Sequence, residues 1–115
     1  MTDVCLFCQI VNGQIPSDQI YEDREILAFK DIHPAAPTHI LVIPKRHIST
    51  VSELTARDVA LVGKIVYRAT RIAKDLELCK EGYRLVWNNG VGAGQSVFHI
   101  HLHLLGGRRF SWPPG

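Results

Sequence analysis

Apolar positions recur along this 115-residue chain with two different periods, which predict its helices and strands. From Thr55 to Leu76 they return every three or four residues, with Lys and Arg on the opposite side, as in an amphipathic helix of about six turns. Thr55 and Asp58 have the spacing of a capping pair at its start. A second, short helix is expected over residues 4–11. Short alternating or wholly apolar runs predict strands over residues 19–21, 25–32, 39–43, 83–89 and 97–105.

The size and composition of the chain fit one α+β domain over residues 1–115, with about five antiparallel strands, one long helix and one short helix. With 46% hydrophobic residues, the domain can bury a core without disulfides. Its net charge of +2 is too balanced to predict nucleic-acid or membrane binding, and no apolar stretch approaches the ~20 residues of a membrane span. An odd count of 3 cysteines and the lack of a signal-peptide pattern favour a cytoplasmic location.

Three histidines alternate with apolar residues near the end of the chain, at His99, His101 and His103. Because side chains alternate across a strand, these three share one face. The residues beside them point the other way, toward the long helix: Phe98, Ile100, Leu102 and Leu104. An antiparallel sheet often leaves one face in water, so we expect the histidine face to be open to solvent.

Three imidazoles in a row on one face allow two chemical interpretations. Either they bind a metal, since imidazole is the commonest metal ligand, or one of them is a nucleophile that the others hold and polarise. The loop directly before them, residues 90–96, favours the second. Its glycines let backbone N–H groups approach an anion and Ser96 adds a hydroxyl donor, which is typical of a phosphate cradle.

The run over residues 99–105 matches the signature His-φ-His-φ-His-φ-φ, in which φ is an apolar residue. On this motif the chain resembles the histidine triad (HIT) superfamily, and the likeness extends from about Phe7 to Gly115. Further segments similar to the family lie at residues 28–32, 36–39, 42–48 and 94–96. The ending Ser-Trp-Pro-Pro-Gly, residues 111–115, is similar to the Hint branch of histidine triad nucleotide-binding proteins.

The resemblance implies a HIT-like fold and a purine nucleoside phosphoramidase. Such enzymes hydrolyse AMP or GMP joined through nitrogen to an amine, and they also cleave aminoacyl-adenylates. The middle histidine, His101 here, attacks the α-phosphorus and becomes a transient nucleotidyl-histidine, which water then hydrolyses. A neutral imidazole is a competent nucleophile near its ordinary pKa of ~6.5, so the reaction needs no cofactor.

The resemblance also implies roles for the residues around His101. Ser96 and His103 contact the phosphoryl oxygens or the leaving group. His39 and the backbone carbonyl of His99 orient the His101 ring. The remaining nucleotide-binding residues it implies are Asn88, Gly94 and Gln95 beside the phosphate, Asp31 on the ribose hydroxyls, and Phe7, Ile10, Phe29 and Ile32 around the purine. The alternative for the last two is ordinary core packing.

Two cysteines at x-x spacing, Cys5 and Cys8, offer two soft ligands for tetrahedral zinc. Relatives with this pair complete a structural zinc site through residues that match His47 and His99 here, so the resemblance implies a structural zinc. The alternative is two buried thiols on one helix face, because other Hint-like proteins lack both cysteines and the metal. Cys79 is expected to be buried.

Three other functions compete with the phosphoramidase. A dinucleoside polyphosphate hydrolase keeps the fold and changes the substrate, but the Ser-Trp-Pro-Pro-Gly ending argues against it. A nucleotide-binding regulatory module depends on partner contacts more than on turnover. A catalytic metal centre uses all three triad histidines as ligands. The resemblance further implies a homodimer in which the two sheets run together and Trp112 reaches toward the partner's site.

Overall fold

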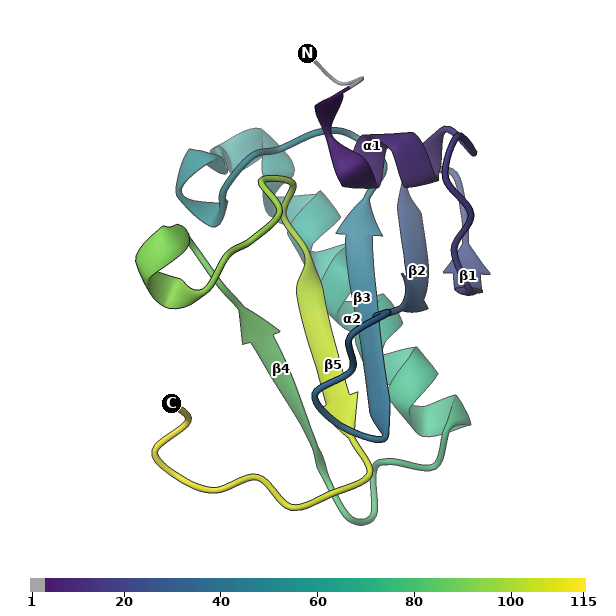
Figure 1. Ribbon diagram of the computed structural model, residues 1–115, viewed down its shortest axis with the longest axis vertical. Helices are drawn as coiled ribbons and strands as arrows, with labels where there is room; N and C mark the ends of the chain where they lie inside the picture. The colour runs from purple at the N-terminus through teal and green to yellow at the C-terminus, as the bar shows by residue number, and fades with distance from the viewer. Residues whose placement is uncertain (1–3) are drawn as a thin grey trace.

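One antiparallel sheet of five strands, in the order β1-β2-β3-β5-β4, organises the computed structural model, which describes residues 4–115 (Figure 1). The strands are β1 (Gln19–Glu22), β2 (Ile26–Lys30), β3 (Thr38–Pro44), β4 (Tyr83–Trp87) and β5 (Leu102–Gly106). The helices are the short α1 (Leu6–Val11) and the long α2 (Val59–Asp75). The α+β fold predicted from the sequence is confirmed. No helix within residues 4–115 has the length and apolar character needed to cross a membrane.

Helix α2 covers one face of the sheet and lies behind it in Figure 1. Its inward stripe of Leu61, Ile65, Ala69, Ile72 and Ala73 packs against apolar residues of β2, β3 and β5. The predicted capping pair is present, since the Thr55 side chain and the Asp58 carboxylate each accept from the other's backbone N–H. One 3-10 turn, Ala56–Asp58, lies between the cap and α2, so the α-helix begins later than the apolar pattern indicated.

The opposite face of the sheet is also covered, because α1 packs over its upper end in Figure 1. Phe7 and Ile10 of α1 form a second core with four residues of β2 and β3: Leu27, Phe29, Leu41 and Ile43. The expectation of a solvent-open histidine face is therefore wrong. His99 is fully buried and His101 is 7% exposed.

The last strand is shorter than the alternation predicted, and this changes where Phe98 lies. Pairing with β3 and β4 begins only at Leu102, so residues 97–101 approach the sheet without a strand ladder. The backbone N–H of Ile100 instead donates to the carbonyl of Ile48, 2.8 Å away. Phe98 consequently stays 40% exposed, and the expectation that it packs under the long helix is wrong.

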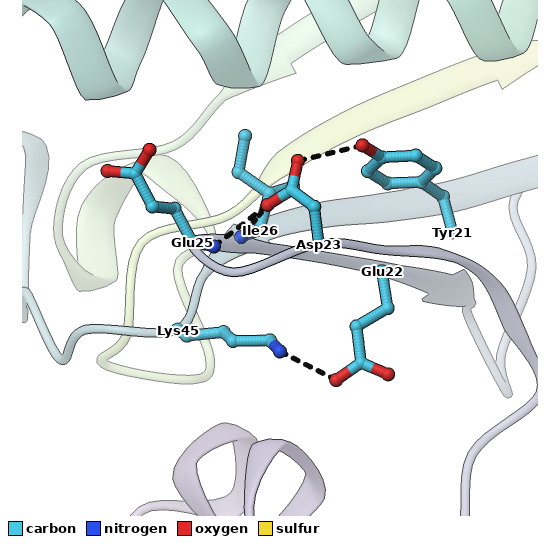
Figure 2. A network of polar contacts seen from close by, with 6 residues as sticks. All are labelled: Tyr21, Glu22, Asp23, Glu25, Ile26 and Lys45. Atoms are coloured by element: carbon cyan, nitrogen blue, oxygen red, sulfur yellow. Dashed lines mark hydrogen bonds and ion pairs between the residues drawn. The ribbon is translucent and has the colours of Figure 1, made fainter.

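The turn from β1 to β2 is fixed by one carboxylate, Asp23, shown in Figure 2. One of its oxygens accepts from the backbone N–H groups of Glu25 and Ile26, and the other accepts from the Tyr21 hydroxyl at 2.8 Å. Nearby, the Lys45 ammonium lies 2.6 Å from the Glu22 carboxylate. These contacts hold the hairpin that carries Phe29 to the second core.

Candidate active site and metal centre

A pocket of about 240 Å³ opens between α1, the end of β2 and the histidine segment. Phe7, Phe29 and Leu41 give it an apolar floor that is almost fully buried. The Phe7 ring meets Phe29 edge-on, with ring centres 5.5 Å apart. The polar residues that line the pocket are Ser17, Lys30, Asp31, His33, Ser96, His101 and His103.

His101 is held in one tautomer by a backbone oxygen. Its Nδ1 lies 2.8 Å from the carbonyl oxygen of His99, which can only accept, so Nδ1 carries the proton. The lone pair is therefore on Nε2. Burial lowers the pKa of His101 below its ordinary value, which keeps the ring neutral at physiological pH. The Phe7 ring stands edge-on to it, with centres 5.1 Å apart. The site thus contains a fixed, neutral imidazole whose lone pair accepts no hydrogen bond from residues 4–115.

A second chain of hydrogen bonds fixes the tautomer of His103. The backbone N–H of Ala35 donates to His39 Nδ1 at 2.9 Å, so the proton of neutral His39 is on Nε2. That Nε2 lies 2.9 Å from His103 Nδ1, which must accept. His103 then carries its own proton on Nε2, a buried atom with no hydrogen-bond partner among the described residues. The pocket therefore contains an unused proton donor beside the lone pair of His101.

Asp31 is the acidic residue among those that line the pocket. One of its oxygens accepts from the backbone N–H of His33 at 2.8 Å, and the other lies 3.4 Å from His39 Nε2. Burial lowers the pKa of His39 even though the Asp31 charge raises it. The pair is therefore a contact between a carboxylate and a neutral ring, and Asp31 keeps acceptor capacity for a ligand.

The loop before the histidines is braced by the Gln95 side chain. Its oxygen accepts from the Gly90 N–H at 2.7 Å, and its amide donates to the carbonyls of Ser49 and Val97. Gly94 has a φ of 92°, a conformation that favours glycine. A side chain on Gly94 would also contact the amide of Asn88, 3.9 Å away. The loop conformation thus depends on Gly94 and on a Gln95 side chain that faces the protein.

Four sulfur and nitrogen ligand atoms gather behind the pocket, all within 4.8 Å of one another. They belong to Cys5, Cys8, His47 and His99. The Nε2 of His99 lies 2.7 Å from the carbonyl of Pro44 and so carries a proton, which leaves Nδ1 bare and facing the two sulfurs at 3.4 and 3.5 Å. Cys8 Sγ also lies 3.3 Å from His47 Nδ1. Two thiols, two imidazoles and an outer carbonyl that orients one of them suit tetrahedral Zn²⁺.

The half-buried position of His103 predicts a pH-dependent stability. Burial, together with His101 and His39, lowers its pKa to about 4, while Asp31 acts in the opposite direction. The unfolded chain takes up this proton near pH 6.5, so the free energy of unfolding should fall as the pH drops from about 6.5 to about 4. Replacing His103 with Gln should reduce that fall by about 1 to 3 kcal/mol. Urea denaturation at both pH values measures it, and an unchanged fall in the variant would contradict the lowered pKa of His103.

Comparison with known proteins identifies the family. The family model described as the HIT domain matches residues 12–110. The chain belongs to the HIT family. A HIT-like protein of Synechocystis is 48% identical over 115 residues, covering all of both chains. A 14 kDa zinc-binding protein of Zea mays is 46% identical over 112 residues, which are 96% of this chain and 87% of the maize protein.

A solved HIT structure has nearly the same fold. The crystal structure of a HIT family hydrolase from Legionella pneumophila superposes with a TM-score of 0.95 at 53% identity. The match covers 96% of this chain and 99% of that chain. Because both identity and coverage are high, the likeness extends beyond the triad motif to the whole HIT fold.

The structure brings most of the residues named from the sequence to one pocket. Those that line it are Phe7, Ile10, Phe29, Asp31, Ile32, Ser96, His101 and His103. Ile32 is 83% exposed, so it lines the pocket without belonging to the core. Five other residues named from the sequence do not line the pocket. His39 contacts His103, and His99 contacts the two cysteines. The other three belong to the neighbouring loop or its edge: Asn88, Gly94 and Gln95.

Eight further residues line the pocket and were not predicted from the sequence: Leu6, Ile15, Pro16, Ser17, Lys30, His33, Leu41 and Val97. Leu6 precedes Phe7 by one position and Ile10 by four, so the helical spacing of α1 was the available signal. Leu41 carries no such signal, because it reads as an ordinary core residue of a strand. Cys79, expected to be buried, is exposed where the chain leaves α2.

Proposed function

We propose that the chain is a hydrolase of purine nucleoside 5′-phosphoramidates, with AMP or GMP as the nucleotide and an amine as the leaving group. Aminoacyl-adenylates are further substrates of the same site. The observation that carries the proposal is the tautomer of His101, whose Nδ1–H is bound to the His99 carbonyl and whose Nε2 lone pair is free in an apolar pocket. The HIT family hydrolase from Legionella pneumophila supports the hydrolase class.

The reaction has two displacements at the α-phosphorus. The His101 Nε2 lone pair forms a P–N bond while the bond from phosphorus to the amine breaks, and the departing nitrogen needs a proton. His103 Nε2–H is the donor within the site, because His39 fixes the proton on that atom. Water then attacks the nucleotidyl-histidine: its oxygen bonds to phosphorus as the bond from phosphorus to His101 Nε2 breaks, and the proton that the water loses restores the His103 Nε2–H. The nucleoside monophosphate leaves, and both histidines are neutral again.

The nucleotide is held by three kinds of contact. The purine lies on the apolar floor of Phe7 and Phe29, with Ile10 and Ile32 beside it. Asp31 accepts hydrogen bonds from the ribose hydroxyls through its free acceptor capacity. The residues that contact the phosphate are Ser96, Asn88 and the backbone of Gly94, and Gln95 braces their loop.

A structural Zn²⁺ completes the protein at Cys5, Cys8, His47 and His99. Bound there, it would supply a tetrahedral cross-link between α1, the segment after β3 and the segment before β5. The 14 kDa zinc-binding protein of Zea mays supports this assignment. The His101 lone pair provides the nucleophile without a metal, so catalysis itself needs no cofactor. Cys5 and Cys8 are free thiols and must stay reduced to bind zinc, so they favour a location of the protein in the cytoplasm.

The protein is proposed to act as a homodimer whose two sheets are joined. Strand β4 is a sheet edge, paired only with β5 among the described strands, and it offers a second row of backbone groups to a partner. Trp112 follows on an exposed tail and is 82% exposed, as expected of a side chain that reaches another subunit. Light scattering at micromolar concentration should give twice the 12.9 kDa chain mass.

The substrate class is tested by comparing two nucleotides. We expect kcat/KM for adenosine 5′-phosphoramidate to exceed that for diadenosine tetraphosphate by at least about 100-fold, because the apolar pocket of about 240 Å³ accommodates a single purine. Chromatography of released AMP measures both rates. A preference for the dinucleotide would assign the chain to the polyphosphate-cleaving alternative.

A further inference from the structure

A second hollow, of about 520 Å³, lies beside the nucleotide pocket. It is bordered by the start of α1, the segment after β3 and the segment that leads to the triad. Its lining residues are Val4, Cys5, Leu6, His47, Ser49, Ser96, Val97 and Phe98. The proposed nucleotide contacts leave this space unused.

The two hollows share a wall. Leu6, Ser96 and Val97 line both of them, so they meet at the residue proposed to contact the phosphate. A molecule whose phosphorus lies against Ser96 can therefore extend its purine into the first hollow and its other substituent into the second. In a nucleoside phosphoramidate, that other substituent is the amine that leaves.

The second hollow has a mixed lining, with polar groups and apolar side chains in about equal shares. Val4, Leu6 and Phe98 are large apolar side chains that stay 78%, 42% and 40% exposed, and all three lie on this one hollow. These side chains offer an aromatic or aliphatic substituent apolar surface to contact. Among residues 4–115 the lining includes no Asp, Glu, Lys or Arg, and its remaining polar groups are two serine hydroxyls and the edge of the Cys/His cluster.

We propose that this hollow is the leaving-group subsite and that it selects amines with an aromatic or branched aliphatic side chain. The inference rests on the proposed phosphoramidase function, whose leaving group it specifies. Phe98 is the specificity-determining residue, because it lines the second hollow and is absent from the first. A substrate with a benzyl-sized leaving group gains binding energy by burying that group against Phe98. A substrate whose leaving group is ammonia has no such group to bury.

The test uses two substrates with the same nucleotide, adenosine 5′-phosphoramidate and its N-benzyl derivative. Ammonia and benzylamine have similar basicity, so the chemical step is closely matched. We expect Phe98→Ala to lower kcat/KM for the benzyl substrate about tenfold and to leave the unsubstituted substrate within about twofold. The unsubstituted substrate also reports whether the variant is folded. Tyr67→Ala, on an aromatic residue of α2 that is 59% exposed, is the matched control and should change neither value.

The outcomes separate this inference from the function on which it rests. If the wild-type protein hydrolyses neither substrate, the proposed function itself fails. If it hydrolyses both and Phe98→Ala leaves their ratio unchanged, or Tyr67→Ala shifts the ratio equally, the subsite is overturned and the phosphoramidase stands. A selective loss of the benzyl substrate in Phe98→Ala alone supports the subsite.

Discussion

Replacing His101 with Gly is expected to lower kcat/KM for adenosine 5′-phosphoramidate by about four orders of magnitude or more. The substitution removes the lone pair that forms the covalent intermediate. His103 cannot take its place, because its outward nitrogen carries the proton that His39 fixes there. AMP affinity should stay within about tenfold, since the apolar floor of Phe7 and Phe29 remains. Steady-state hydrolysis and calorimetric AMP binding measure the two quantities.

Chemical rescue distinguishes a lost nucleophile from a damaged fold. Added imidazole should restore turnover in His101→Gly and release AMP imidazolide first, because the small molecule occupies the space left by the missing ring. In the wild type, quenching in alkaline denaturant, in which a bond from phosphorus to histidine nitrogen survives, should trap a nucleotidyl adduct that peptide mass spectrometry locates on His101. If the variant keeps its rate without imidazole, or the adduct lies on another residue, the assignment of His101 is wrong.

The fold was predictable because it depends on periodic patterns. The alternation over residues 25–32 and the apolar run 39–43 correspond to β2 and β3, and the helical spacing corresponds to α2. The position of helix α1 over the histidines was not predictable from these patterns. Helix α1 has only six residues, and its position depends on Phe7 packing against Phe29 and His101. Those contacts join segments distant in the sequence, and no local pattern indicates them.

The protonation state of His103 could not be predicted from the sequence either. His39 and His103 meet because β3 pairs with β5 in a register that sets Leu41 opposite His103 and His39 opposite Leu105. A sequence with no known pairing leaves that register open. The tautomer further requires the loop after β2 to present the Ala35 N–H to His39. The residues of the site were therefore available from the motif, whereas their protonation follows only from the three-dimensional contacts.

Metal removal is expected to have the second large effect, on stability and on nucleotide binding together. The four ligands come from α1, from the segment after β3 and from the segment before β5, so zinc bound to the folded state alone would stabilise it by several kcal/mol. Chelation, or Cys8→Ser, should lower the unfolding midpoint by about 10 to 20 °C in a domain of this size. Elemental analysis should find one zinc per wild-type chain.

The same cluster should be coupled to the pocket, because its ligands hold parts of both walls. Cys5 and Cys8 flank Phe7, and His99 supplies the carbonyl that orients His101. Zinc removal should therefore weaken AMP binding severalfold, and by linkage AMP should tighten zinc binding by the same factor. Cys79→Ser, an exposed cysteine outside the cluster, is the control that should alter neither. If the metal-free protein has an unchanged unfolding midpoint, Cys5 and Cys8 are structural thiols and bind no stabilising zinc. If AMP affinity does not depend on zinc, α1 is held in place by its apolar contacts alone.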